Sequence, residues 1–295
     1  MSKPVSKTFG VVTTCSQQGW GEYGSKMVNG FLKHFPEDVR LYLYVDFKKP
    51  IAHERVIVRS IPELCADLVA FQDETARFDF ARGERVCHSG HEVAYDASLI
   101  WNARKFSFKV FVVEHAVLNA AEDVMIWLDA DSVAFDDVPL ELLDATIPAD
   151  CMIGYLGRSW KYSECGYVAY NTARPLTRRF VSSVAGMYRT GAIYSLKEWH
   201  DSYVFDVVRR EFETRLGARS FNISKDVADI DHVFVNSEIG RHVDHLKGGR
   251  KADGHSRPGD VVRHADVAYW ATVAGSAVTT AAAEANEREA TGAQE

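Results

Sequence analysis

The sequence has no apolar run that approaches the roughly 20 residues needed to cross a bilayer as a helix. Residues 1–7 lead straight into a strand-like segment, without the apolar stretch of a signal peptide. Both absences argue against an integral membrane protein and a secreted one. We therefore expect a soluble, cytoplasmic protein.

Cysteine is scarce and scattered, and no two cysteines have the CxxC spacing. This excludes a disulfide framework and a zinc knuckle, so we expect reduced thiols. The late histidines form no HxxxH pair beside a suitable carboxylate, which argues against a zinc site. A formal net charge of -7 argues against a protein that coats nucleic acid, although short clusters such as Arg178-Arg179 leave a local basic groove open.

The chain has 295 residues, of which 46% are hydrophobic, enough for one large α/β domain with a sizeable core. Strand-like segments at 8–15 and 39–46 flank a helical pattern at 27–35, an order that predicts a parallel sheet with right-handed crossovers. Further strands are expected at 56–58, 124–128, 151–155 and 166–170, and helices at 98–118, 175–188 and 202–215. We expect one domain over 1–270 and an Ala/Glu-rich tail, helical or disordered, over 271–295.

Two carboxylates, Asp129 and Asp131, follow the uninterrupted apolar run at 124–128. Such a run is typical of a central parallel strand, and ligands bind at the carboxyl edge of an open α/β sheet. Carboxylates there suit Mg²⁺ or Mn²⁺ together with diphosphate oxygens. The alternatives are an ordinary turn or cap, or a haloacid-dehalogenase-type phosphatase in which Asp129 is the nucleophile.

A second constellation lies late in the chain, where His245, Gly248 and Lys251 follow one another at intervals of three residues. The imidazole offers nitrogen to a metal, the glycine lets the backbone approach phosphate, and the lysine opposes its charge. Taken alone, the segment also fits a solvated basic loop. With Asp129 and Asp131 it favours a metal and diphosphate site.

With these two elements the sequence resembles the GT-A glycosyltransferases, and within them glycosyltransferase family 8, the glycogenin and lipopolysaccharide galactosyltransferase group. The matching segments are Thr13-Thr14-Cys15, Asp129 with Asp131, Glu164-Cys165-Gly166 with Asn171, and His245 with Gly248 and Lys251. Two features depart from the family pattern. Glu164-Cys165 replaces the usual Asn-Ala, and Ala252-Asp253 stands where proline and tryptophan commonly follow the lysine.

The resemblance implies a Rossmann-like GT-A fold, an α/β/α sandwich with a mostly parallel sheet. It also implies a Mn²⁺- or Mg²⁺-dependent glycosyltransferase that uses a nucleoside-diphosphate sugar, a UDP-sugar foremost, and retains configuration. The implied metal ligands are Asp129, Asp131 and His245. The implied donor-binding residues are Thr13, Cys15, Arg104, Lys109, Asp129, Gly166, Gly248 and Lys251. For Arg104, a plain helix-surface charge is an equal alternative.

The acceptor side is expected near Glu198-Trp199-His200-Asp201. Trp199 is a candidate stacking platform, and Asp201 is the first candidate for a general base if the reaction inverts. If it retains, Asp201 or Glu164 would stabilise the cationic centre; alternatively, Asp201 only caps the helix at Ser202. A glycan, a lipid-linked sugar, a protein and a modified nucleic-acid base all stay open as acceptors, as does a non-catalytic carbohydrate-binding module.

Overall fold

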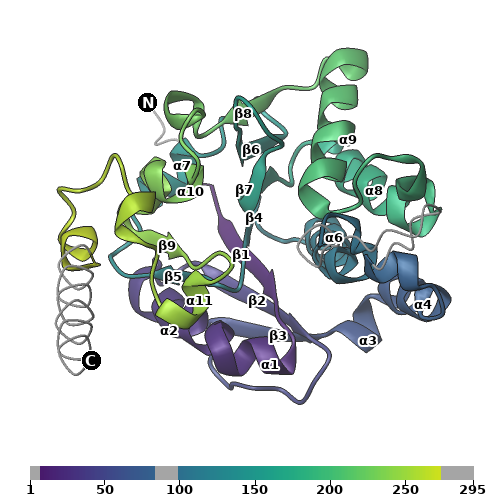
Figure 1. The fold of residues 1–295 in the computed structure, drawn as a ribbon, viewed down its shortest axis with the longest axis horizontal. Helices are drawn as coiled ribbons and strands as arrows, with labels where there is room; N and C mark the ends of the chain where they lie inside the picture. Colours follow the sequence, from purple (N-terminus) through teal and green to yellow (C-terminus); the bar gives the residue numbers. More distant parts are fainter. Residues whose placement is uncertain (1–6, 84–98, 274–295) are drawn as a thin grey trace, which may run out of the picture.

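The computed structural model describes residues 7–83 and 99–273, which fold around a seven-stranded sheet of order β3-β2-β1-β4-β7-β6-β8 (Figure 1). Two more strands, β5 and β9, pair with each other beside it. The strands within the described residues are β1 (Phe9–Thr14), β2 (Arg40–Val45), β3 (Val56–Ser60), β4 (Val124–Leu128), β5 (Ser132–Ala134), β6 (Ile153–Leu156), β7 (Glu164–Asn171), β8 (Ser220–Asn222) and β9 (Val243–His245).

The sheet is mostly parallel, as predicted. Strands β3, β2, β1 and β4 run parallel to one another, and β8 runs parallel to β6. Only β7 runs antiparallel, to both β4 and β6. All five residues of β4 are buried, which explains its uninterrupted apolar sequence.

Helices cover both faces of the sheet, so the predicted α/β/α sandwich is confirmed. Successive residues of β4 point to opposite sides. Met125 and Trp127 pack in the core under α4, α6, α8 and α9, whereas Ile126 and Leu128 pack in the core with α2 and α10. Figure 1 shows α6, α8 and α9 together on one side. The helices are α1 (Gln17–Gly19), α2 (Ser25–His34), α3 (Ile61–Leu64), α4 (Ala66–Thr75), α6 (Ala103–Leu118), α7 (Leu140–Ala145), α8 (Pro175–Arg189), α9 (Asp201–Leu216), α10 (Val233–Asn236) and α11 (Arg250–Asp253).

Most predicted elements are present within a residue or two of their expected ends. The helix expected at 98–118 is divided, because Asn102 caps α6 by accepting a hydrogen bond from the backbone N–H of Lys105 at 2.9 Å. The short strands β5, β8 and β9 were not predicted, since three residues leave too little periodicity to detect.

The segment after β9 packs back onto the domain. The ring of Tyr269 stacks on Phe135 with centroids 3.8 Å apart, and the indole of Trp270 donates a hydrogen bond to the Gly240 carbonyl at 2.8 Å. The limits of the domain at 1–270 stay a prediction, and Cys87 and residues 274–295 lie outside the described residues. Within residues 7–83 and 99–273, no helix is both long and apolar enough to cross a membrane.

Candidate active site and metal centre

A cavity of about 570 Å³ opens at the carboxyl ends of three parallel strands. Thr14 ends β1, Asp46 follows β2 and Asp129 follows β4, and all three line the cavity. The Asp129 backbone N–H donates to the Gly166 carbonyl on β7 at 2.9 Å, which fixes the start of the turn after β4. Parallel strands thus deliver polar side chains to one edge of the sheet.

The small sheet of β5 and β9 brings His245 to the two aspartates. Ser132 of β5 pairs in register with His245 of β9, and the Leu246 N–H donates to the Asp131 carbonyl at 2.8 Å. The imidazole Nε2 lies 3.5 Å from an Asp129 oxygen and 3.4 Å from an Asp131 oxygen. The residues that the sequence placed far apart are therefore neighbours in the fold.

The three side chains suit a divalent cation. One ligand atom from each of Asp129, Asp131 and His245 lies within 4.8 Å of the other two. Burial acts to raise the pKa of Asp129, but Lys109 and His245 lower it well below its usual range. Burial acts to lower the pKa of His245, but hydrogen bonds to both carboxylates raise it to about 10. The two carboxylates thus hold a proton on His245, and a divalent cation with mixed oxygen and nitrogen ligands would take the place of that proton.

The ring of His245 is held from three sides. A Cβ atom on Gly166 would lie 2.7 Å from its Cε1, so the absence of a side chain there makes room for the imidazole. The ring of Phe234 lies 4.8 Å away between centroids. Burial lowers the pKa of His232 to about 4, so its ring is neutral, and its Nε2 lies 3.3 Å from the His245 carbonyl oxygen.

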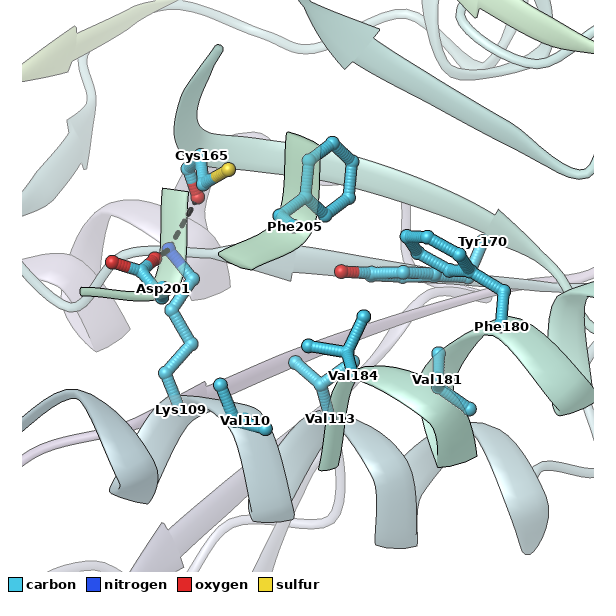
Figure 2. A pocket seen from close by; sticks show the side chains of 10 residues that line it. All are labelled: Lys109, Val110, Val113, Cys165, Tyr170, Phe180, Val181, Val184, Asp201 and Phe205. Carbon is cyan, nitrogen blue, oxygen red and sulfur yellow. Dashed lines mark hydrogen bonds and ion pairs between the residues drawn. The ribbon is translucent and has the colours of Figure 1, made fainter. Parts of the chain in front are cut away.

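Lys109 links Asp129 to Asp201 across the cavity. Its ammonium lies 3.0 Å from Asp129 and 2.9 Å from Asp201, and it donates to the Cys165 carbonyl at 2.5 Å. Figure 2 shows the side chain rising from α6 towards Cys165 and Asp201. Burial acts to lower the pKa of Lys109, but the two carboxylates raise it well above its usual range. An apolar cavity of about 30 Å³ lies beside it (Figure 2).

Two further lysines come from the segment after β9. The Lys251 ammonium lies 2.9 Å from an Asp131 oxygen, and the Lys247 ammonium donates to Glu164 at 2.5 Å. Arg158 lies 3.5 Å from the same Glu164 oxygen. Burial acts to raise the pKa of Glu164, but Lys247, His245 and Arg158 lower it to about 2. Glu164 is therefore a carboxylate at neutral pH.

Most of the site residues predicted from the sequence line this cavity of about 570 Å³. They are Cys15, Lys109, Asp129, Asp131, Glu164, Gly166, Asp201, His245, Gly248 and Lys251. Thr13 and Arg104 do not line it. Thr13 is 1% exposed in the core of β1, and Thr14 takes the cavity position. Arg104 lies off the cavity, and its neighbour on α6, Lys105, lines the wall instead.

Other lining residues were not predicted from the sequence. They include Tyr23, Asp46, Lys105, Arg158, Tyr162 and Lys247. Asp46 is the last residue of the strand predicted at 39–46, so the rule that singled out Asp129 would have found it as well. Arg158 and Tyr162 lie in the connection between β6 and β7, whose path depends on tertiary packing.

Trp199 is not the expected stacking platform. It is 4% exposed and packs in the core against Tyr194 and Phe80. Helix α9 begins at Asp201, and the cap is His200, whose Nδ1 accepts a hydrogen bond from the Tyr203 N–H at 3.4 Å. The expected alternative, that Asp201 only caps the helix, is wrong.

Asn171 lies at the other end of β7 from Glu164 and takes no part in the cavity. Its side-chain amide donates to the carbonyls of Ala149 and Cys151, both at 3.2 Å. These two hydrogen bonds hold the backbone that leads into β6.

Comparison with known proteins gives no match to a family model and none among curated proteins. The solved structures that are similar in fold include two glycosyltransferases. The bifunctional glycosyltransferase WbbM, in its apo form, is 14% identical with a TM-score of 0.46 over 84% of this chain and 47% of its own. Mouse xyloside xylosyltransferase 1, also apo, is 11% identical with a TM-score of 0.42 over 73% of this chain and 85% of its own. This chain thus spans about half the length of WbbM, and likeness of this degree carries no inference about chemistry. Membership of family 8 stays a prediction.

Proposed function

We propose that this protein is a metal-dependent glycosyltransferase that uses a nucleoside-diphosphate sugar, a UDP-sugar foremost. The observation that carries the proposal is the cluster of Asp129, Asp131 and His245 at the sheet edge, in a cavity whose walls also hold lysines. Its volume of about 570 Å³ is that of a small-molecule site. A carboxylate pair with a neighbouring imidazole and cations suits a metal-bound diphosphate.

Asp129, Asp131 and His245 would hold Mn²⁺ or Mg²⁺. The cation, when bound, neutralises negative charge on the leaving nucleoside diphosphate. Lys251 is the residue best placed to help, because it reaches the same carboxylate from the segment after β9. Gly248, at a φ of 64° between Lys247 and Lys251, adopts the left-handed turn that directs both lysines to the cavity.

The nucleoside end of the donor is assigned to the wall formed by Cys15, Tyr23 and Asp46. Burial, with Asp46 nearby, raises the pKa of Cys15 to about 11, so this thiol stays protonated and meets the donor as a neutral group. Tyr23 offers a ring for stacking and Asp46 offers carboxylate oxygens to ribose hydroxyls.

Retention of configuration is the outcome that the acceptor side supports. Inversion needs a general base, and the candidate groups there already have partners. Asp201 pairs with Lys109, and Glu164, with its pKa lowered to about 2, is a weak proton acceptor. The His200 Nδ1 accepts the helix-capping hydrogen bond and its Nε2 pairs with Glu198 at 2.9 Å.

A retaining transfer needs no separate base. The bond between the sugar's anomeric carbon and the diphosphate oxygen breaks, and a new bond forms to the acceptor oxygen on the same face. The acceptor's hydroxyl proton leaves with the nucleoside diphosphate. Asp201 and Glu164 place two negative charges beside the cavity where the sugar becomes cationic.

Thermal-shift screening against nucleoside-diphosphate sugars with Mn²⁺ tests the proposal, followed by assay of nucleoside-diphosphate release. A true donor raises the melting temperature by mass action. EDTA abolishes the release and added Mn²⁺ restores it. Full release in EDTA contradicts the proposal. So does hydrolysis of p-nitrophenyl phosphate that Asp129→Asn abolishes, because that result identifies a phosphatase.

A further inference from the structure

A large aromatic side chain is left in water beside the cavity. Trp160 is 56% exposed, and it lies in the connection between β6 and β7, two residues from each of Arg158 and Tyr162. Both of those residues line the cavity. The indole therefore stands at the rim of the cavity.

The exposed indole belongs to a cluster with Tyr162 and Lys161. The Lys161 ammonium lies 5.8 Å from the Trp160 ring centroid and 5.1 Å from that of Tyr162, so one cation contacts both rings. Tyr162 is half-buried, with its ring 4.3 Å from that of His200. Two aromatic rings, one at the cavity wall and one in water, are thus linked through Lys161, and the Arg158 guanidinium lies 5.4 Å from the centroid of the inner ring.

His200 fixes this surface in place. Its Nδ1 accepts from the Tyr203 N–H and its Nε2 lies 2.9 Å from a Glu198 oxygen, so the ring carries its proton on Nε2 and cannot rotate freely. Because the His200 ring packs against Tyr162, it holds that ring at the wall. His200 is a positioning residue.

We propose that the acceptor is itself a sugar, whose apolar ring face stacks on the exposed indole of Trp160, with Tyr162 beside it at the cavity wall. The proposal rests on the proposed function and names its second substrate. Rings that bind pyranoses need hydrogen-bonding groups beside them, and the exposed ammonium of Lys161 supplies donors next to both rings.

The charges near the rings favour a sugar over a nucleic acid or a lipid. The cations near the rings are matched by as many carboxylates: Arg158, Lys161, Lys109 and Lys247 stand against Glu164, Glu198, Asp129 and Asp201. This side is therefore not the positive groove that tracks a phosphate backbone. The same mixture of charges is unsuited to an acyl chain. Balanced charge around aromatic faces suits a neutral hydroxylated ring.

The test measures steady-state transfer from the identified donor to p-nitrophenyl β-glucoside, β-galactoside and β-xyloside with Mn²⁺. We expect Trp160→Ala to raise the acceptor KM roughly tenfold, as loss of a stacked face does, while the donor KM stays as in the wild type. Trp160→Phe keeps a flat ring and restores most of the loss. Phe78→Ala, at an aromatic residue 36% exposed and away from the cavity, is the control.

Release of nucleoside diphosphate without acceptor separates the two proposals, because water then replaces the sugar. If the wild type cleaves no sugar nucleotide, the proposed function fails and the acceptor proposal falls with it. If donor cleavage proceeds but none of the glycosides accepts sugar, the acceptor proposal alone is overturned. An acceptor KM for Trp160→Ala within twofold of the wild type also overturns it.

Discussion

At the scale of single residues, close ion pairs keep the carboxylates and ammonium groups of the cavity charged at neutral pH. Glu164 is 6% exposed, and its pKa lies near 2 in the folded protein against an ordinary 4.5. A depressed carboxyl pKa stabilises the folded state above pH 4.5, and this contribution is lost as the pH falls towards 2.

Lowering the pH should therefore remove much of the stability that the Glu164 carboxylate contributes. We expect the difference in free energy of unfolding between wild type and Glu164→Gln to shrink by about 2 kcal/mol between pH 7 and pH 3. Urea denaturation at both pH values measures it. Glu211→Gln, at an exposed glutamate on α9, is the control and should change far less. A difference that is the same at both pH values contradicts the assignment.

Lys251 has two roles that one substitution separates. Its ammonium pairs with Asp131 at 2.9 Å and so competes with a cation for that carboxylate, yet it is also assigned to the diphosphate. Lys251→Ala should bind Mn²⁺ alone at least as tightly as the wild type, but raise the donor KM roughly tenfold for a lost charge-assisted contact.

Calorimetry of Mn²⁺ binding and initial-rate kinetics measure the two effects of Lys251→Ala. Lys225→Ala, at an exposed lysine outside the cavity, is the matched control. Weaker Mn²⁺ binding together with an unchanged donor KM would reverse the assigned roles.

At the scale of elements, the site depends on how β7 meets β9. Gly166 on β7 leaves space for the His245 ring, whereas a Cβ there would lie 2.7 Å from Cε1 and 3.0 Å from Nδ1. A histidine displaced by about 1 Å no longer meets both aspartates.

Gly166→Ala is thus expected to weaken Mn²⁺ binding and donor cleavage at least roughly tenfold, comparable to loss of an outer contact of a metal ligand. The paired control is Gly186→Ala in α8, where an added Cβ meets nothing within 4 Å. That change should stabilise the protein by about 0.5–1 kcal/mol and leave catalysis intact. Wild-type Mn²⁺ affinity in Gly166→Ala would show that the ring is not confined as described.

At the scale of the whole molecule, the sequence predicted the sheet and the pairing of distant motifs better than the loops. The buried run at 124–128 identified β4, and the rule that parallel strands end at one edge placed Asp129 and Asp131 there. His245 was predicted from spacing, although the strands that bring it there, β5 and β9, were too short to see.

The residues that were missed or misplaced share a physical reason. Arg158, Tyr162 and Trp160 lie in a loop whose course is set by tertiary contacts. Trp199 was expected at the surface beside charged residues, but its ring fills the core. Thr13 and Arg104 lie on the predicted elements, but the next residue of each, Thr14 and Lys105, lines the cavity instead. The sequence did not show which side chain faces the cavity, because neighbouring positions point to different sides.

The most direct test of the account is a titration of Mn²⁺, followed by electron paramagnetic resonance, into the wild type, Asp131→Asn and Asp136→Asn. Asp136 is an exposed aspartate just beyond β5 and serves as the control. We expect one bound Mn²⁺ per chain in the wild type and in Asp136→Asn. In Asp131→Asn we expect binding weaker by about two orders of magnitude, with donor cleavage lost. Wild-type Mn²⁺ affinity in Asp131→Asn, with undiminished donor cleavage, would contradict it.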